Sequence, residues 1–402
     1  MKGFRNLLVT VALAIPFTGH ALDVVAKSAI IIDATTGKVL WAKDAETPRY
    51  PASTTKIMTG LLLIENRLPT DIITAPGDVM NVKEASMHLK PFERVSARDM
   101  LYALMLRSAN DGCYAVACDI AGSVPKFAQM MNERARQIGC THTHFDNPNG
   151  LNDPLHYTSA HDLARIAREA MKRPEFREVV RTYKKSISRS INSKDCTMVN
   201  HNKWLPKDPT ADGIKTGYTV PAGHCYVGSA TRNGYRVITV VMNSPHWQQD
   251  HQNMLKWAFD GYARLPLVQK DSEVGTPPVL GGVKDKVAVA TVESVDSLVS
   301  RAKLPPNGQP PMRTEFAEPL RAPIKRGQVV GTLVVTDPEG FEQRVPIAAT
   351  EDVAEATLLP SPGKGSGNFA MLGGALVLGG IVFRGRARRS RYSTQAVRPR
   401  SS

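Results

Sequence analysis

The sequence predicts an α+β fold, in which an antiparallel sheet is flanked by helices, followed by a smaller all-β region. Strand-like runs occur early in the chain, helical patterns fill the middle, and strand-like runs return after them. Strands on both sides of a helical region favour an α+β arrangement over alternating βαβ units. With 402 residues, of which 42% are apolar, the chain is long enough for about two domains with ample core.

Residues 1–21 have the features of a secretory signal peptide. Lys2 and Arg5 supply the positive start, Leu7–Phe17 form the apolar segment, and Gly19-His20-Ala21 is a small-x-small cleavage site. An N-terminal membrane anchor would need a longer apolar run. The mature chain is therefore expected to begin at residue 22, outside the cytoplasm.

The elements of the first domain follow from periodicity. Residues 29–41 indicate two antiparallel strands, because β-branched Ile30–Ile32 precede the turn Thr35-Thr36-Gly37 and an apolar return strand. Apolar residues at helical spacing predict five helices, over residues 53–66, 97–107, 123–138, 162–171 and 174–182. Three successive strands are then expected at 213–219, 223–231 and 235–243.

From residue 265 the composition changes to short β-rich runs separated by paired prolines and glycines. Asp337-Pro338-Glu339-Gly340 indicates a hairpin turn within this region. Residues 265–356 are therefore expected to form an all-β domain. Because they carry no set of nucleophile, base and orienting group, the expected role is that of a spacer or docking module.

The C-terminal residues predict a flexible linker at 357–367, a transmembrane helix at 368–384 and a basic cytoplasmic tail at 385–402. The 19 uncharged residues between Lys364 and Arg384 reach about 28 Å as a helix, which spans the bilayer core of about 30 Å. The arginines that follow belong in the cytoplasm by the positive-inside rule. The expected location is thus the cell membrane, with residues 22–264 on the periplasmic side. Two alternatives are a surface helix, which needs a polar face that 369–383 lacks, and a sorting signal removed by processing.

The formal charge of +14 invites a nucleic-acid function, but its distribution argues against one. Eight basic residues and no acidic ones lie from Lys364 onward, so over half of the excess belongs to the short tail. The body of the chain has no basic recognition element with interleaved aromatic residues. Nucleic acid is not an expected partner.

Three short motifs stand out, and each has an ordinary structural explanation on its own. Ser53 and Lys56 form S-x-x-K at the start of an apolar helix, where residues three apart share a face. Ser108-Ala109-Asn110 follows the apolar stretch Met100–Leu106, at a point where Ser and Asn favour a turn. Lys215-Thr216-Gly217 opens a predicted edge strand.

Together, and in this order, the motifs indicate catalysis. S-x-x-K, an S-D-N-type triplet and K-T-G are the set of the penicillin-recognising serine enzymes, with Ala109 here where the usual triplet has Asp. A serine is a weak nucleophile unless a neighbouring base takes its proton. A lysine can be that base only when burial or a second cation lowers its pKa.

The chain resembles the D-alanyl-D-alanine carboxypeptidases, the low-molecular-mass penicillin-binding proteins of bacterial cell-wall metabolism. The resemblance extends from Val25 to Val353. Besides the motifs it includes these stretches: Ala29–Asp33, Thr36–Leu40, Tyr50–Ser53, Leu101–Asp111, His144-Phe145, Asn149–Leu151, Tyr157–Ala160, Asp162-Leu163, Asp212–Gly217 and Ala222-Gly223. It implies a β-lactamase/transpeptidase-like catalytic domain over residues 22–264. Ala322–Gly327 resembles the C-terminal β domain of the same enzymes.

The resemblance implies a role for each motif residue. Ser53 would be the nucleophile and Lys56 its base. Lys215 would be the second cation that keeps Lys56 partly neutral. Ser108 would relay the proton to the departing D-alanine, and Asn110 would orient Lys56 and the amide of the acyl chain.

The substrate-binding residues implied in the same way lie on the predicted strand that carries K-T-G. Lys215 would attract the terminal carboxylate of the substrate, and Thr216 would hydrogen-bond it. Gly217 lies between Thr216 and Tyr218, whose main-chain N–H would form the oxyanion hole with that of Ser53. Relatives often place a carboxylate-binding arginine beyond the last core strand, but 245–251 contains none. Either His246 or His251 substitutes, or Thr216 and Lys215 suffice.

The implied reaction is the removal of the terminal D-alanine from peptidoglycan pentapeptide stems through an acyl-enzyme on Ser53, with β-lactams as covalent inhibitors. The alternatives are a D,D-endopeptidase, a β-lactamase or an inactive wall-binding module. Residues 146–153 offer no glutamate of the kind that β-lactamases use for deacylation.

No cofactor is expected. A metal site at His142, His144 and His161 is the sharper alternative, but no carboxylate–histidine motif accompanies these residues. The odd count of five cysteines gives no disulfide framework. They are expected to be mostly reduced and buried.

Overall fold

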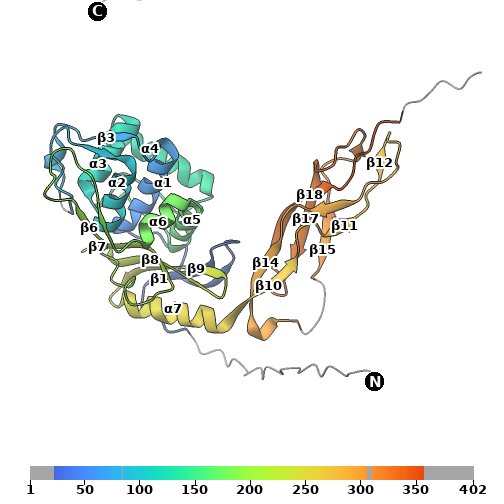
Figure 1. Ribbon diagram of the computed structural model, residues 1–402. Helices are drawn as coiled ribbons and strands as arrows, with labels where there is room; N and C mark the ends of the chain where they lie inside the picture. The colour runs from blue at the N-terminus through green and yellow to red at the C-terminus, as the bar shows by residue number, and fades with distance from the viewer. Residues whose placement is uncertain (1–21, 84, 306–309, 357–402) are drawn as a thin grey trace, which may run out of the picture. The chain divides into compact units, whose positions relative to one another are not determined.

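The computed structural model describes residues 22–83, 85–305 and 310–356 (Figure 1). The predicted signal peptide, linker, transmembrane helix at 368–384 and basic tail lie outside the described residues. Within the described ranges, no helix combines the length and hydropathy that crossing a membrane requires.

A five-stranded antiparallel sheet forms the centre of the first domain, with the strand order β2-β1-β9-β8-β7. The strands are β1 (Ser28–Asp33), β2 (Val39–Lys43), β7 (Ala211–Thr219), β8 (Gly223–Arg232) and β9 (Tyr235–Ser244). The predicted strands are confirmed. β7, which carries Lys215-Thr216-Gly217, is an edge strand as expected.

Both faces of this sheet are buried, which explains why its central strands are almost continuously apolar. Ile30 and Ile32 of β1 pack into one core, whereas Ala29 and Ile31 pack into a second core on the other face. α5 (Ala160–Met171) covers the first face, and α7 (Trp247–Gly261) covers the second, on the side of the sheet away from the other helices (Figure 1).

The helical region lies between β2 and β7 in the chain. The first predicted helix is wrong in its first turn, because Ala52–Thr55 form a 3-10 helix (η1) before α1 (Lys56–Asn66). The second is divided into α2 (Ala97–Tyr102) and a π-helical turn, η3 (Ala103–Arg107). The remaining helices are α3 (Asn110–Ala121), α4 (Val124–Ile138) and α6 (Pro174–Arg181). The sequence did not predict α3 or α7.

Short elements complete the domain. They are η2 (Val79–Asn81), the two-stranded pair β3 (Ile72–Thr74) with β4 (Arg94–Ser96), and the two-stranded pair β5 (Lys184–Ser186) with β6 (Thr197–Val199).

The all-β region begins directly after α7. Its main sheet has the order β11-β13-β18-β17-β15, beside the pairs β10-β14 and β12-β16. Asp337–Phe341 connect β17 to β18, which confirms the predicted hairpin. The elements are β10 (Tyr262–Val268), β11 (Glu273–Gly275), β12 (Val279–Leu280), β13 (Val289–Thr291), β14 (Val295–Ser300), η4 (Arg301–Lys303), β15 (Met312–Glu315), β16 (Leu320–Arg321), β17 (Val329–Thr336) and β18 (Glu342–Ala349).

Candidate active site

Ser53 lies in η1, where the chain turns sharply before α1. The residue before it, Ala52, has φ +49°, a left-handed conformation that is uncommon for a residue other than glycine. η1 packs closely against β7. A Cβ atom at Gly217 would lie only 2.9 Å from the main-chain nitrogen of Ser53. Glycine at this position therefore allows β7 to approach the serine closely.

Lys56 is fully buried and holds three oxygen partners. Its Nζ lies 3.0 Å from Ser53 Oγ, 2.8 Å from Asn110 Oδ1 and 2.7 Å from the main-chain oxygen of Asn149. Burial lowers the pKa of Lys56 to about 8, although Cys113 and Asp111 oppose the shift. The amine is therefore held against the serine hydroxyl with a substantial neutral population near pH 8.

The S-A-N triplet lies between η3 and α3. Ser108 ends the π-helical turn with φ +65°, again left-handed, and Asn110 is the first residue of α3. The Asn110 amide nitrogen donates to the Lys83 carbonyl at 3.1 Å, which directs Oδ1 toward Lys56. Non-glycine residues in this conformation often accompany functional sites, and Ala52 and Ser108 are two such cases.

Lys215 is buried in β7, with its Nζ 2.9 Å from the Thr216 carbonyl oxygen. Burial and then repulsion from Lys56 lower its pKa to about 7. The repulsion between the two amines is mutual, so protonating both is unfavourable. The two lysines behave as a coupled pair in which one neutral amine is favoured near neutral pH.

A cleft of about 450 Å³ opens over these residues. Ser53, Ser108, Asn110, Thr216, Gly217 and Tyr218 line it. Lys56 and Lys215 do not belong to this lining, since both are buried. The structure thus brings the three predicted motifs together around one cavity.

Sequence reasoning missed two contributions to the site. The first is the carbonyl oxygen of Asn149, which a motif search cannot detect because any residue type can supply it. The second is the segment 201–203, whose His201 and Lys203 line the cleft. A basic and a titratable residue two apart, between the predicted helix at 174–182 and the predicted strand at 213–219, were the available signal.

Neither histidine suggested as a substitute for the arginine lines the described cleft. His251 is completely buried, with Nδ1 2.7 Å from Thr239 Oγ1 and its ring against Trp204 and Tyr226. His246 is exposed beside the start of α7, outside the described lining of the cleft. The suggestion that His251 substitutes is wrong for a steric reason, since the core seals its ring from ligand.

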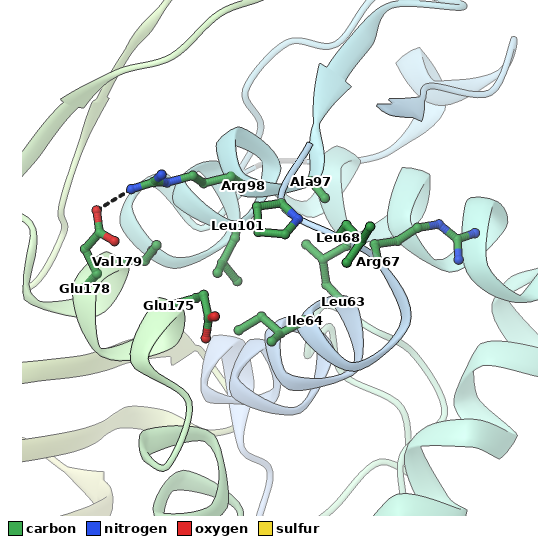
Figure 2. A pocket seen from close by; sticks show the side chains of 11 residues that line it. Leu63, Ile64, Arg67, Leu68, Ala97, Arg98, Leu101, Glu175, Glu178 and Val179 are labelled. Carbon is green, nitrogen blue, oxygen red and sulfur yellow. Dashed lines mark hydrogen bonds and ion pairs between the residues drawn. The ribbon is translucent and has the colours of Figure 1, made fainter. Parts of the chain in front are cut away.

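Two other features lack the chemistry of a catalytic site. A pocket of about 220 Å³ between α1, α2 and α6 has mostly apolar walls, and its Arg98 already pairs with Glu178 at 2.6 Å (Figure 2). His142 and His161 both contact Glu46. In the described residues no group of three ligand side chains has the arrangement of a metal site.

The five cysteines are free thiols, and Cys113, Cys140 and Cys225 are buried.

Known proteins match both parts of the chain. Residues 15–246 match the Peptidase S11 family model, described as D-alanyl-D-alanine carboxypeptidase, and residues 262–355 match that of the penicillin-binding protein 5 C-terminal domain. D-alanyl-D-alanine carboxypeptidase DacF of Bacillus subtilis is 32% identical over 339 residues, 82% of this chain and 86% of that protein. DacD of Escherichia coli is 31% identical over 363 residues, 86% of this chain and 91% of that protein.

A solved structure agrees with these matches. Penicillin-binding protein 5 from Haemophilus influenzae superposes with a TM-score of 0.69 at 28% identity, covering 84% of this chain and 99% of that one. The chain belongs to the Peptidase S11 family of D-alanyl-D-alanine carboxypeptidases. It is a serine-type carboxypeptidase, and therefore a hydrolase, with a catalytic domain followed by an all-β domain.

Proposed function

We propose that this carboxypeptidase removes the terminal D-alanine of peptidoglycan pentapeptide stems through an acyl-enzyme on Ser53. The observation that supports it most strongly is the contact of Ser53 Oγ with the buried amine of Lys56 at 3.0 Å. Ser53 Oγ attacks the carbonyl carbon of the D-Ala-D-Ala bond, and its proton passes to Lys56. The C–N bond then breaks, the proton goes to the departing D-alanine, and water later hydrolyses the ester.

The geometry around Lys56 suits a general base. A neutral amine has two N–H bonds and one lone pair. Asn110 Oδ1 and the carbonyl oxygen of Asn149 can only accept hydrogen bonds, so each takes one of the two N–H groups of the neutral Lys56 amine. The lone pair is then left for the hydroxyl proton of Ser53. When the amine takes that proton, the two acceptors stabilise the new ammonium ion.

The remaining residues act on the substrate. Lys215 and Thr216 bind the terminal carboxylate, whose negative charge favours the ammonium form of Lys215, and the positive charge of Lys215 then disfavours protonation of Lys56. The main-chain N–H groups of Ser53 and Tyr218 stabilise the oxyanion of the tetrahedral intermediate. The close approach of Gly217 to η1 supports this pairing. Ser108, which lines the cleft, carries the proton from Lys56 to the leaving amine.

The same proposal extends to inhibitors and location. β-Lactams acylate Ser53, because they mimic the D-Ala-D-Ala end. The chain is exported by residues 1–21 and anchored by a single span at 368–384. The catalytic domain (22–264) lies on the periplasmic side and is followed by the β domain at 265–356 and a linker at 357–367. The tail at 385–402 is cytoplasmic. Carbonate washing should leave the full-length protein in membranes, and truncation at Ser361 should release it. A mature mass that lacks the segment would identify a processed signal instead.

Peptide mapping after penicillin treatment tests the nucleophile. The adduct is expected on residues 51–56, and Ser53→Ala should abolish it while the protein still melts cooperatively. Lys56→Ala should slow acylation by at least about a hundredfold. An adduct at another site would overturn the assignment.

Incubation with a pentapeptide and with a cross-linked dimer should release D-alanine from the pentapeptide. Cleavage of the dimer alone would indicate an endopeptidase.

A further inference from the structure

The segment 200–204 presents its side chains alternately to the core and to the cleft. Asn202 and Trp204 are buried, whereas His201 and Lys203 are exposed and line the cleft. Asn202 fixes this alternation, since its amide nitrogen donates to the Tyr226 hydroxyl at 3.0 Å and its Oδ1 accepts from the Trp204 N–H at 3.1 Å. His201 and Lys203 are therefore held toward the cleft by the hydrogen bonds of the buried Asn202 between them.

Main-chain contacts tie this segment to the catalytic motifs. The His201 N–H donates to the Leu106 carbonyl at 3.1 Å, two residues before Ser108. Asn200 Oδ1 accepts from the Asn202 N–H at 2.9 Å, and its amide nitrogen donates to Thr182 O at 3.0 Å. The two cleft-facing side chains thus have a fixed position beside the S-A-N triplet.

The described lining of the cleft contains basic side chains and no acidic ones. Among the described residues that line it there is no Asp or Glu, whereas Lys203, His201 and His224 are present. Arg107 lies close to His201, but it is already paired with Asp195 at 2.6 Å. In the described residues, the mouth of the site therefore offers Lys203 and two imidazole rings without a competing carboxylate, which suits an anionic group of the substrate.

From this arrangement we propose that His201 and Lys203 form the outer half of the binding site for the substrate's terminal carboxylate, in place of an arginine. The proposal rests on the proposed function, in which Lys215 and Thr216 form the inner half. Lys203 supplies a permanent charge. His201 supplies a positive charge only when the carboxylate is bound, because it then takes up a proton from solvent.

The groups around His201 explain why its protonation depends on a bound carboxylate. Partial desolvation, and then the positive charges of Lys215, Arg107, Lys203 and Lys56, lower the pKa of His201, so the imidazole is neutral in the empty site. A bound carboxylate adds a negative charge among these cations. An opposite charge at hydrogen-bond distance favours the protonated ring. Substrate binding and protonation of His201 therefore support each other.

The test compares an N-acylated L-Lys-D-Ala-D-Ala peptide with its C-terminal amide, which lacks only the anionic charge. The wild-type ratio of kcat/KM for acid over amide should be large and should rise as pH falls from 8 to 6. Titration of Lys56 affects both substrates and cancels in the ratio. Each of His201→Asn and Lys203→Gln should reduce the ratio by about tenfold, the scale of one charge-assisted hydrogen bond. His201→Asn should also reduce this pH dependence to the part that Lys215, with a pKa of about 7, contributes, whereas Lys203→Gln should retain it in full.

Lys194→Gln is the matched control, because it removes one exposed positive charge from a neighbouring loop outside the described cleft lining. Its ratio should equal that of the wild type. Unchanged ratios in both cleft variants would overturn the proposal, and so would equal losses in the control. Failure of the proposed function is distinguishable, because the wild type would then form no penicillin adduct on Ser53 and hydrolyse neither peptide.

Discussion

The main-chain oxygen of Asn149 lies 2.7 Å from Nζ of Lys56. No side-chain substitution can delete this acceptor, so its position depends on the loop that carries it. Asn147 Oδ1 accepts from the N–H of Gly150 at 2.7 Å and from that of Asn149 at 3.3 Å, which fixes the turn. The orientation of Lys56, the proposed base, therefore depends on a loop that contains none of the proposed catalytic side chains.

Gly150→Ala should inactivate the enzyme without changing any motif. Gly150 has φ +87°, and a Cβ atom there would overlap the carbonyl of Ala52, the residue before Ser53. The loop must shift away from η1, and the Asn149 oxygen moves with it. We expect penicillin acylation to slow by at least about a hundredfold.

Gly122→Ala is the control for this substitution. Gly122 has φ +77°, and no atom of the described residues would lie within 4 Å of a Cβ added there. Alanine therefore costs only about 1 kcal/mol of left-handed strain. Its acylation rate should match the wild type. An equally active Gly150→Ala protein would contradict the role assigned to the loop.

Asn110→Asp should shift the pH profile of acylation. In the wild type the rate should rise between about pH 7 and pH 8, as the coupled pair loses a proton and Lys56 becomes neutral. A carboxylate 2.8 Å from Nζ favours the ammonium ion, so the pKa of Lys56 rises and the profile moves to higher pH. Stopped-flow acylation from pH 6 to 10 measures this.

Asn110→Ala separates charge from geometry. It removes the acceptor without adding a negative charge, so acylation should slow at every pH and the profile should not move upward. If Asn110→Asp and Asn110→Ala give the same profile, Lys56 is not the group whose titration limits acylation.

The sequence predicted the sheet and most helices because their signals are local. β1 and β9 are apolar on both faces, and α4 and α5 carry apolar residues at helical spacing. α3 was missed because Ser108-Ala109-Asn110 has turn chemistry and Gly112 follows it. A Cβ at Gly112 would lie 2.9 Å from Leu104, so tertiary packing selects this glycine within a helix.

The motifs predicted which side chains surround the cleft, but not all of the groups that hold them. α7 places Met254, Leu255, Ala258 and Phe259 at helical spacing, yet the sequence indicated only a carboxylate-binding region at its first residues. His201 reaches the cleft because of contacts with Leu106 and, through Asn202, with Tyr226. Such long-range contacts leave no periodic pattern in a single sequence.

A fragment that ends at Arg264 should still be acylated by penicillin. It retains Tyr262, whose hydroxyl donates to the Leu40 carbonyl at 3.2 Å within the core of the first domain. It loses the partners of Lys38, which donates to Leu298 O and Glu339 Oε2, each at 2.8 Å, and also pairs with Asp337.

The fragment should therefore melt at a lower temperature than the full chain, with an unchanged acylation rate. Circular dichroism must first establish that it is folded. A folded fragment without acylation would mean that the β domain completes the site.

The stability of the enzyme should depend on pH through Lys56 and Lys215. Burial holds the pKa of both amines below the ordinary value of 10.5, at about 8 and about 7. Between about pH 7 and pH 10.5 the unfolded chain therefore binds more protons than the folded one. The contribution of this pair to the free energy of unfolding then rises with pH through that window. Below pH 7 both states carry the protons, and the folded state bears the full penalty of buried charge.

The double variant Lys56→Met/Lys215→Met lacks this penalty while keeping similar side-chain volume. It should be more stable than the wild type at pH 7, and its advantage should shrink toward pH 9.5. Urea denaturation of both proteins at the two pH values gives the difference, in which other titrating groups, such as the buried tyrosines, largely cancel. An advantage that is the same at both pH values would mean that neither lysine has a depressed pKa in the folded enzyme. Lys56 would then remain protonated near neutral pH, and it could not be the base that activates Ser53.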